Sequence, residues 1–344
     1  MSIATYILVS LIKIVLVVFV LLTGVAYTVL LERKVVGHMQ NRWGPSRVGP
    51  FGIWQPLADG LKFIFKEDLT PPYVYKPLYL LAPIISVTVA LSSIAVIPFG
   101  PWINAGGVHT PLQIADVNIG LLVVLGLTSI GVYGVVLAGW SSNSKYSMLG
   151  GLRASAQMVS YEIALGLSLV GVLILSGSFS LREVVDAQSG TWFGFIPKWN
   201  FFKGQFVAFF IYIMAAYAET NRIPFDLAEA ETELVAGYHT EYSSMKFAMF
   251  FMAEYANMIT VACLASVLFF GGWSGPVFGP PILRDILPIL WFVLRVFIFL
   301  FIYIWVRGTL PRFRYDQLMA FGWTFLLPLA IANTIVTALV VALR

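Results

Sequence analysis

Cysteine, histidine and charged residues are scarce in this chain of 344 residues, and each scarcity excludes a class of protein. The single cysteine, Cys263, rules out a disulfide within the chain and an iron–sulfur cluster held by several thiolates. The three histidines lie in different loops without metal-ligand spacing. Neither a G-x-G-x-x-G fingerprint nor a Walker A loop is present. We therefore expect no cofactor on this chain, and any redox centre on a partner.

Charged residues make up 11% of the chain and hydrophobic residues 59%, whereas soluble domains carry about 25% charged residues. Apolar runs of roughly 20 residues, the length of a membrane-spanning helix, recur throughout. They lack the alternation expected of barrel strands. The sequence predicts an all-α polytopic membrane protein, a single transmembrane domain over residues 1–344. The first run lacks a basic region and a cleavage site, so we expect it to remain as a span.

Eight spans are predicted, at about 3–31, 77–99, 118–139, 154–176, 203–219, 247–270, 285–307 and 320–342. Most loop lysines and arginines follow the odd-numbered spans, which places those loops in the cytoplasm and the N-terminus outside. This asymmetry accounts for most of the net charge of +4 and gives no reason to expect a nucleic-acid partner.

The first predicted cytoplasmic loop contains an amphipathic segment at about 51–66. Apolar residues recur there every three or four positions, while Gln55, Asp59, Lys62 and Lys66 fill the other face. The segment is too short and too polar to span, so we expect an interfacial helix. It could anchor the loop on anionic lipid, or its aromatic residues could wall an entrance for a long apolar ligand.

The most unusual segment is acidic and covers about 219–246. It holds Glu219, Asp226, Glu229, Glu231, Glu233 and Glu241 against one base, Arg222. If the segment is helical from Pro224, then Asp226, Glu229 and Glu233 share one face. Crowded carboxylates in an enclosed site would hold protons at neutral pH. The alternative is a solvated acidic loop.

Four ionisable residues fall inside predicted spans: Lys13, Glu162, Glu254 and Arg295. Each costs roughly 2.5–3.5 kcal/mol near the bilayer centre, so such residues usually face a wet or paired interior. Glu162 and Glu254 suit a proton pathway. The structural alternative pairs Glu254 with Arg295, and Lys13 could simply reach the outer interface.

Several motifs together identify the chain as resembling one family. Glu32-Arg-Lys, Gln40-Asn-Arg, Gln55-Pro-Leu-Ala-Asp59, Ala218-Glu-Thr-Asn-Arg-Ile-Pro-Phe-Asp226, Ser160-Tyr-Glu162, Met252-Ala-Glu-Tyr255 and Pro311-Arg-Phe-Arg-Tyr-Asp-Gln317 resemble the heel subunit of respiratory complex I. This is the H subunit of bacterial NADH–quinone oxidoreductase and subunit 1 in mitochondria. The resemblance extends from about residue 20 to 330.

The resemblance implies a proton-pumping quinone reductase in the bacterial cytoplasmic (inner) membrane, equivalent to the mitochondrial inner membrane. It implies a quinone tunnel lined by Arg33, Arg42, Trp54, Asp59 and Phe225. It also implies a proton relay through Glu162, Glu219, Asp226, Glu229, Glu231, Glu233 and Glu254. FMN and iron–sulfur clusters would lie on partner subunits. Implied partners are the peripheral quinone-reducing and iron–sulfur subunits, small membrane subunits, antiporter-like subunits, membrane lipids and the substrate, ubiquinone or menaquinone.

Three alternatives stay open at this point. The heel subunit of a membrane-bound hydrogenase has shared ancestry but needs no quinone. A free-standing cation or proton transporter would use the same carboxylates, although the missing internal repeat counts against it. A passive scaffold for the redox arm would leave the carboxylates as solvated surface.

Overall fold

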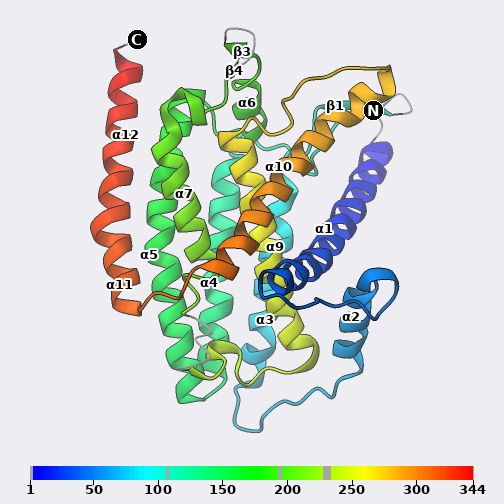
Figure 1. Cartoon of the computed structure of the whole chain (residues 1–344), viewed down its shortest axis with the longest axis vertical. Helices are drawn as coiled ribbons and strands as arrows, with labels where there is room; N and C mark the ends of the chain where they lie inside the picture. The colour runs from blue at the N-terminus through cyan, green and yellow to red at the C-terminus, as the bar shows by residue number, and fades with distance from the viewer. Residues whose placement is uncertain (1–2, 106–107, 193–195, 228–233, 344) are drawn as a thin grey trace.

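The chain forms a bundle of helices in which the first turn of α1 and the last turn of α12 lie at the same end (Figure 1). The computed structural model describes residues 3–105, 108–192, 196–227 and 234–343. Within these ranges, eight helices are long and apolar enough to cross a membrane, which confirms the predicted fold class. They contain α1 (Ile3–Met39), α3 (Lys76–Ser93), α4 (Gly120–Ser141), α5 (Lys145–Ser176), α7 (Phe206–Glu219), α9 (Ser244–Phe269), α10 (Pro281–Thr309) and α12 (Leu327–Ala342). The spans of α7 and α12 include the helical turns before them and run over Phe201–Glu219 and Tyr315–Ala342.

Shorter elements complete the fold. A π-helical turn leads into α7, and α11 with a second π-helical turn leads into α12. Two antiparallel hairpins lie at the end of the bundle that holds both termini (Figure 1). The bounds are α2 (Gln55–Phe65), α6 (Leu181–Asp186), α11 (Tyr315–Ala320), π turns Phe201–Gln205 and Phe321–Leu326, 3₁₀ turns Pro50–Gly52, Ile94–Val96 and Gly237–His239, and strands β1 (Trp102–Ala105), β2 (Val108–Pro111), β3 (Thr191–Trp192) and β4 (Ile196–Pro197).

Two helices are longer than the spans predicted for them. α1 continues to Met39 and α5 begins at Lys145, whereas their spans were predicted to end at 31 and to begin at 154. At about 1.5 Å per residue, a 32-residue helix such as α5 is roughly 48 Å long, against about 30 Å of hydrocarbon. Both helices are therefore longer than the hydrocarbon is thick.

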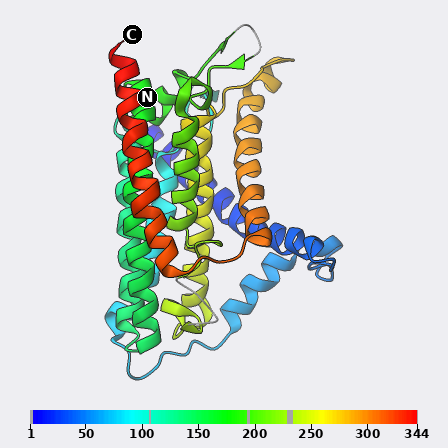
Figure 2. The ribbon, with the colours of Figure 1, turned by 60° about the vertical axis from the view of Figure 1, so that its left-hand side comes forward.

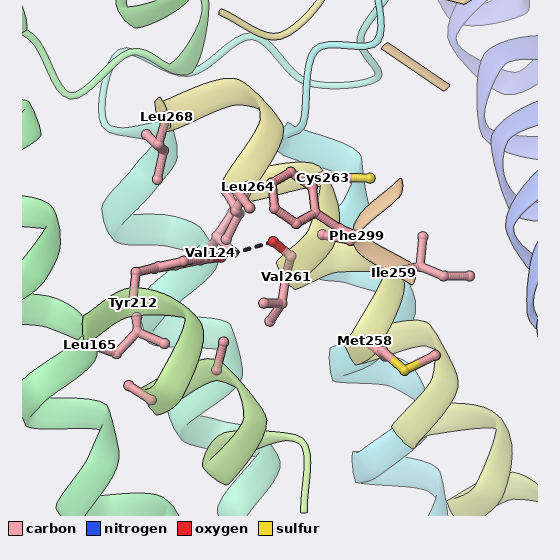
Figure 3. Packing of buried hydrophobic residues seen from close by; sticks show 14 of the residues in the cluster. Val124, Leu165, Tyr212, Met258, Ile259, Val261, Cys263, Leu264, Leu268 and Phe299 are labelled. Atoms are coloured by element: carbon pink, nitrogen blue, oxygen red, sulfur yellow. Dashed lines mark hydrogen bonds between the residues drawn. The ribbon is translucent and has the colours of Figure 1, made fainter. Parts of the chain in front are cut away.

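The core forms around α9, the most enclosed of the spans, which packs against α3 and α10 and faces α5 and α7. Figure 3 shows Tyr212 of α7 reaching α9, where its hydroxyl donates a 2.8 Å hydrogen bond to the Val261 carbonyl oxygen. Cys263 is buried in the same helix. This packing fixes α9 as the central element on which the site is built.

The amphipathic helix α2 lies at the end opposite the termini and projects sideways from the bundle beside the end of α1 (Figure 2). Ser244 at the start of α9 donates a 2.9 Å hydrogen bond to the Phe63 carbonyl oxygen and thereby ties α2 to the bundle. Leu57, Ile64 and Phe65 remain exposed on its apolar face. The predicted amphipathic helix is present as α2, although Phe51 lies before it in the 3₁₀ turn, and its place at the membrane interface stays a prediction.

Candidate functional site

An ionic cluster joins α1, α9, α10 and the loop after α7. The Arg222 guanidinium lies 3.9 Å from the Glu32 carboxylate and 3.9 Å from the Glu254 carboxylate. It also stacks over the Tyr255 ring, 4.0 Å from its centroid. The Tyr255 hydroxyl donates a 2.9 Å hydrogen bond to Glu32, and Arg307 forms a second ion pair with Glu32. One cation is thus shared between two carboxylates from distant parts of the sequence.

The loop that carries Arg222 is held by α5. The Gln157 side-chain nitrogen lies 2.8 Å from the Ala218 carbonyl oxygen and 2.7 Å from that of Phe225. Asn221 adopts a positive φ of 48°, which turns the chain directly after α7. The same two oxygens also accept backbone hydrogen bonds, from the Asn221 amide at 3.4 Å and the Leu227 amide at 3.1 Å, so the buried Gln157 amide adds shorter bonds from α5 that fix the loop to the bundle. Arg222 is therefore positioned by the bundle.

Asp226 extends the cluster toward the loop after α10. Its carboxylate lies 3.1 Å from the Arg312 guanidinium. Beside it, the Phe313 amide donates a 3.1 Å hydrogen bond to the Pro224 carbonyl oxygen. The described residues 221–227 form turns, so the conditional prediction of a helix beginning at Pro224 is wrong there. The successive turns direct backbone groups to Gln157 and Phe313 instead.

Glu219 and Glu162 both contact hydroxyl groups of α4. The Thr128 hydroxyl is hydrogen-bonded to the Glu219 carboxylate, and the Ser129 hydroxyl to the Glu162 carboxylate. Glu219 ends α7, whereas Glu162 lies within α5. Each hydroxyl also lies 2.9 Å from the Leu125 carbonyl oxygen, so one turn of α4 presents two polar groups to the two carboxyl groups.

A small cavity connects the ionic cluster with this pair. It has about 30 Å³ of space for water and is bounded by residues of α3, α4, α5, α7 and α9. Glu219 and Glu254 both line it, and the Tyr238 hydroxyl donates a 3.0 Å hydrogen bond to Glu254. Two of the predicted relay residues therefore meet at one polar cavity.

A basic pocket of about 490 Å³ lies where the first loop folds back on α1. Arg33 and Arg42 line it, as do Arg47 and Gln55. Arg33 forms a 2.6 Å ion pair with Asp59 of α2. The loop packs tightly against α1 at Gly44, where an added Cβ atom would lie only 2.9 Å from the Lys34 backbone. Two predicted tunnel residues thus line one pocket, with Asp59 paired at its edge.

The other two predicted tunnel residues, Trp54 and Phe225, are not among the residues that line this pocket. Trp54 precedes α2 and is 55% exposed. Phe225 is buried in the bundle, where its ring packs 5.6 Å from that of Tyr161 and 5.5 Å from that of Phe313. Phe225 therefore adjoins the Asp226–Arg312 pair. Glu229, Glu231 and Glu233 lie outside the described residues.

Two ionisable residues of the spans belong to the opposite end of the bundle. Arg295 donates to the carbonyl oxygens of Gly272 and Ser274, so the alternative that pairs it with Glu254 is wrong. Lys13 donates to the Thr110 hydroxyl at 2.6 Å and to the Pro111 carbonyl oxygen at 2.7 Å. Lys13 therefore bonds to polar atoms of β2.

Outside the spans, two tyrosines anchor the loop before α9. Tyr73 donates a 2.7 Å hydrogen bond to Glu241, and this bond raises the pKa of its phenol. Burial raises the pKa of Tyr242 to about 12, so its hydroxyl stays protonated and donates to the Tyr79 carbonyl oxygen. Glu241 thus has a structural partner away from the ionic cluster.

Sequence reasoning missed several members of the site. In the sequence, Glu32 was noted only as part of a motif, and Arg222 only as the single base of the acidic segment. Arg307 was counted only among the basic residues of the loops. Thr128 and Ser129 carried no signal, since hydroxyls are common in spans. For Glu32 a signal existed: an acidic residue that continues an apolar helix into a basic stretch.

The chain matches the family model described as NADH dehydrogenase over residues 12–338. It is 72% identical to the second H subunit of NADH-quinone oxidoreductase from Koribacter versatilis, covering 100% of this chain and 99% of the relative. The first H subunit of the same enzyme from Geobacter sulfurreducens is 52% identical over 95% of this chain and 93% of its own length. The H subunit from Leptospira biflexa is 53% identical, with coverages of 92% and 90%. These three relatives bear the name of the quinone enzyme, which favours that reading over the hydrogenase and transporter alternatives.

Proposed function

Because the chain belongs to the NADH dehydrogenase family, as an H subunit of NADH–quinone oxidoreductase, we propose that it forms a quinone tunnel entrance and relays quinone reduction to proton translocation. The parent enzyme is a multi-subunit translocating oxidoreductase, and this chain is one of its multi-pass inner-membrane subunits. In the proposal, FMN and iron–sulfur clusters belong to peripheral-arm partners. This chain passes the effect of quinone reduction on to small membrane subunits and antiporter-like subunits within the membrane.

The tunnel entrance lies at the end of the bundle that holds α2. The exposed apolar face of α2 suits an isoprenoid tail arriving from the bilayer, and the basic pocket suits a polar headgroup. Trp54 directly precedes α2, and the ion pair between Arg33 and Asp59 joins the pocket to α2. We assign Arg33, Arg42, Trp54 and Asp59 to the entrance and Phe225 to the wall beside the acidic segment.

One observation carries the relay: Arg222 lies at the same 3.9 Å from Glu32 and from Glu254. Glu32 stands next to Arg33 of the entrance, whereas Glu254 lies inside a span. Quinone reduction places negative charge at the headgroup and draws protons from nearby groups. A change in the charge of Glu32 shifts the balance of Arg222 between its two partners, and Glu254 then gains or releases a proton.

From Glu254 the pathway leads inward through the polar cavity to Glu219, and through Thr128 and Ser129 to Glu162. Asp226 joins the relay from the acidic segment, and Glu229, Glu231 and Glu233 are its further predicted members. The loops at this end carry most of the loop lysines and arginines, so we place this end in the cytoplasm and the N-terminus outside.

The test is Glu254→Gln in the intact complex, reconstituted in liposomes. Removing the titratable group should lower quinone reductase turnover and proton pumping together. Glu183→Gln, an exposed glutamate of α6 at the opposite end, is the matched control and should change neither. Normal turnover and normal pumping in a fully assembled Glu254→Gln complex would remove Glu254 from the relay.

A further inference from the structure

The cavity between Glu219 and Glu254 contains a polar residue that the relay has not used. Asn257 of α9 lines the same cavity as both carboxylates. It lies three residues after Glu254, so the two side chains occupy one face of the helix. Ser86 of α3 and Tyr238 line the cavity from other elements. Asn257 therefore lines the same cavity as two groups that are proposed to exchange protons.

The Asn257 side-chain oxygen Oδ1 is buried and has no hydrogen-bond partner within the described part of the chain. An amide oxygen that is buried without a partner destabilises the fold, so such atoms usually bind ordered water. A water molecule needs about 10–15 Å³ of this kind of space and two to four polar partners. The cavity offers about 30 Å³, and its polar lining supplies those partners.

We propose that Asn257 Oδ1 holds an ordered water that carries protons between Glu254 and Glu219, an inference that rests on the proposed function. The protonated Glu254 gives its proton to the water, and the water gives another of its protons to the Glu219 carboxylate. Glu254 ends as the carboxylate, Glu219 as the acid, and the water is regenerated. Throughout, Asn257 Oδ1 accepts a hydrogen bond from the remaining O–H group of the water. The amide does not titrate, so it orients the water without trapping the proton. It is a positioning residue.

The experiment compares Asn257→Leu with Asn257→Thr in the intact complex. Leucine is larger and offers no acceptor, whereas threonine keeps an oxygen that accepts a hydrogen bond and, like asparagine, does not titrate. We expect Asn257→Leu to lower kcat about tenfold with KM for quinone unchanged, and to increase the slowing in deuterated water. Asn257→Thr should recover most of the loss. Ser266→Ala is the matched control: it removes a buried α9 hydroxyl that has no partner among the described residues and lies outside the cavity lining, and it should leave kcat unchanged.

A density map of the unmodified complex at a resolution that shows waters tests the same inference without any variant. It should show a water within hydrogen-bond distance of Asn257 Oδ1. An empty cavity in that map, or an assembled Asn257→Leu complex with unchanged kcat, overturns the inference. Glu219→Gln and Glu254→Gln are measured alongside. If they lower turnover while Asn257→Leu does not, only the bound water is wrong; if neither lowers it, the relay itself is wrong.

Discussion

Asp226 and Arg312 form an ion pair of 3.1 Å that joins the acidic segment to the loop after α10. The two partners differ in exposure, because 8% of the Asp226 side chain is accessible against 33% of the Arg312 side chain. Burial penalises an uncompensated charge far more than exposure does. The pair therefore matters more to Asp226 than to Arg312.

This asymmetry predicts that Arg312→Gln destabilises the complex, and that adding Asp226→Asn restores part of the stability. Loss of the guanidinium leaves a buried carboxylate without this cation, at a cost of roughly 1–3 kcal/mol. The double variant has no charge to desolvate. Thermal unfolding of the purified complex measures both effects. Arg314→Gln is the control, because the Arg314–Asp316 pair is exposed on both sides and should contribute little.

A double variant less stable than Arg312→Gln alone would contradict this account. It would mean that Asp226 is stabilised chiefly by its other contacts, and that the ion pair only orients Arg312.

Trp54 yields a prediction about the entrance. It is 55% exposed beside the apolar face of α2, where a hydrophobic tail would pass before the headgroup reaches the basic pocket. Trp54→Ala should raise the KM for a long-tailed quinone more than for a short-tailed analogue, because only the long tail contacts the lost indole. Loss of one aromatic contact of about 1–1.5 kcal/mol corresponds to roughly a tenfold change.

Trp140→Ala provides the matched control for Trp54. Trp140 is 67% exposed at the end of α4, so its loss should leave both KM values unchanged. Equal increases for the long and short quinones in Trp54→Ala would identify Trp54 as a plain lipid anchor.

The spans and the interfacial helix were predictable because hydropathy and periodicity are local properties of the sequence. Uninterrupted apolar runs gave the eight spans, and the three-to-four residue spacing after Pro50 gave α2. The motifs pointed to the entrance and relay residues through resemblance. Hydropathy, periodicity and motifs each describe one continuous stretch of the sequence, and they do not show which stretches meet in the fold.

The partners within the site were not predictable in the same way. Arg222 lies between Glu32 and Glu254, which are far apart in sequence, and nothing in the local pattern around Arg222 selects them. Arg295 illustrates the converse: the sequence allowed it as an alternative partner for Glu254, but it bonds to loop carbonyl oxygens at the other end of the bundle. Only the packing of α1, α9 and α10 decides which charges meet.

The contact between Ser129 and Glu162 predicts a role for a hydroxyl in the relay. Ser129 of α4 is hydrogen-bonded to Glu162, and its neighbour Thr128 to Glu219. Ser129→Ala removes the hydroxyl that orients Glu162 toward this pathway. A hydrogen bond worth about 1 kcal/mol corresponds to a roughly fivefold loss of rate. We expect that loss in coupled turnover, measured as quinone reduction and proton pumping in liposomes.

Ser160→Ala separates this role from a general effect on packing. Ser160 lies on α5 two residues before Glu162, and its hydroxyl donates a 2.6 Å hydrogen bond to the Ala156 carbonyl oxygen. Its loss removes a hydroxyl of the same size near the same carboxylate, yet it should leave coupled turnover unchanged. In Glu162→Gln, adding Ser129→Ala should cause no further loss, because the two residues act on one step. Independent, additive losses would show that Ser129 serves another part of the bundle and that the path from Glu219 reaches Glu162 without it.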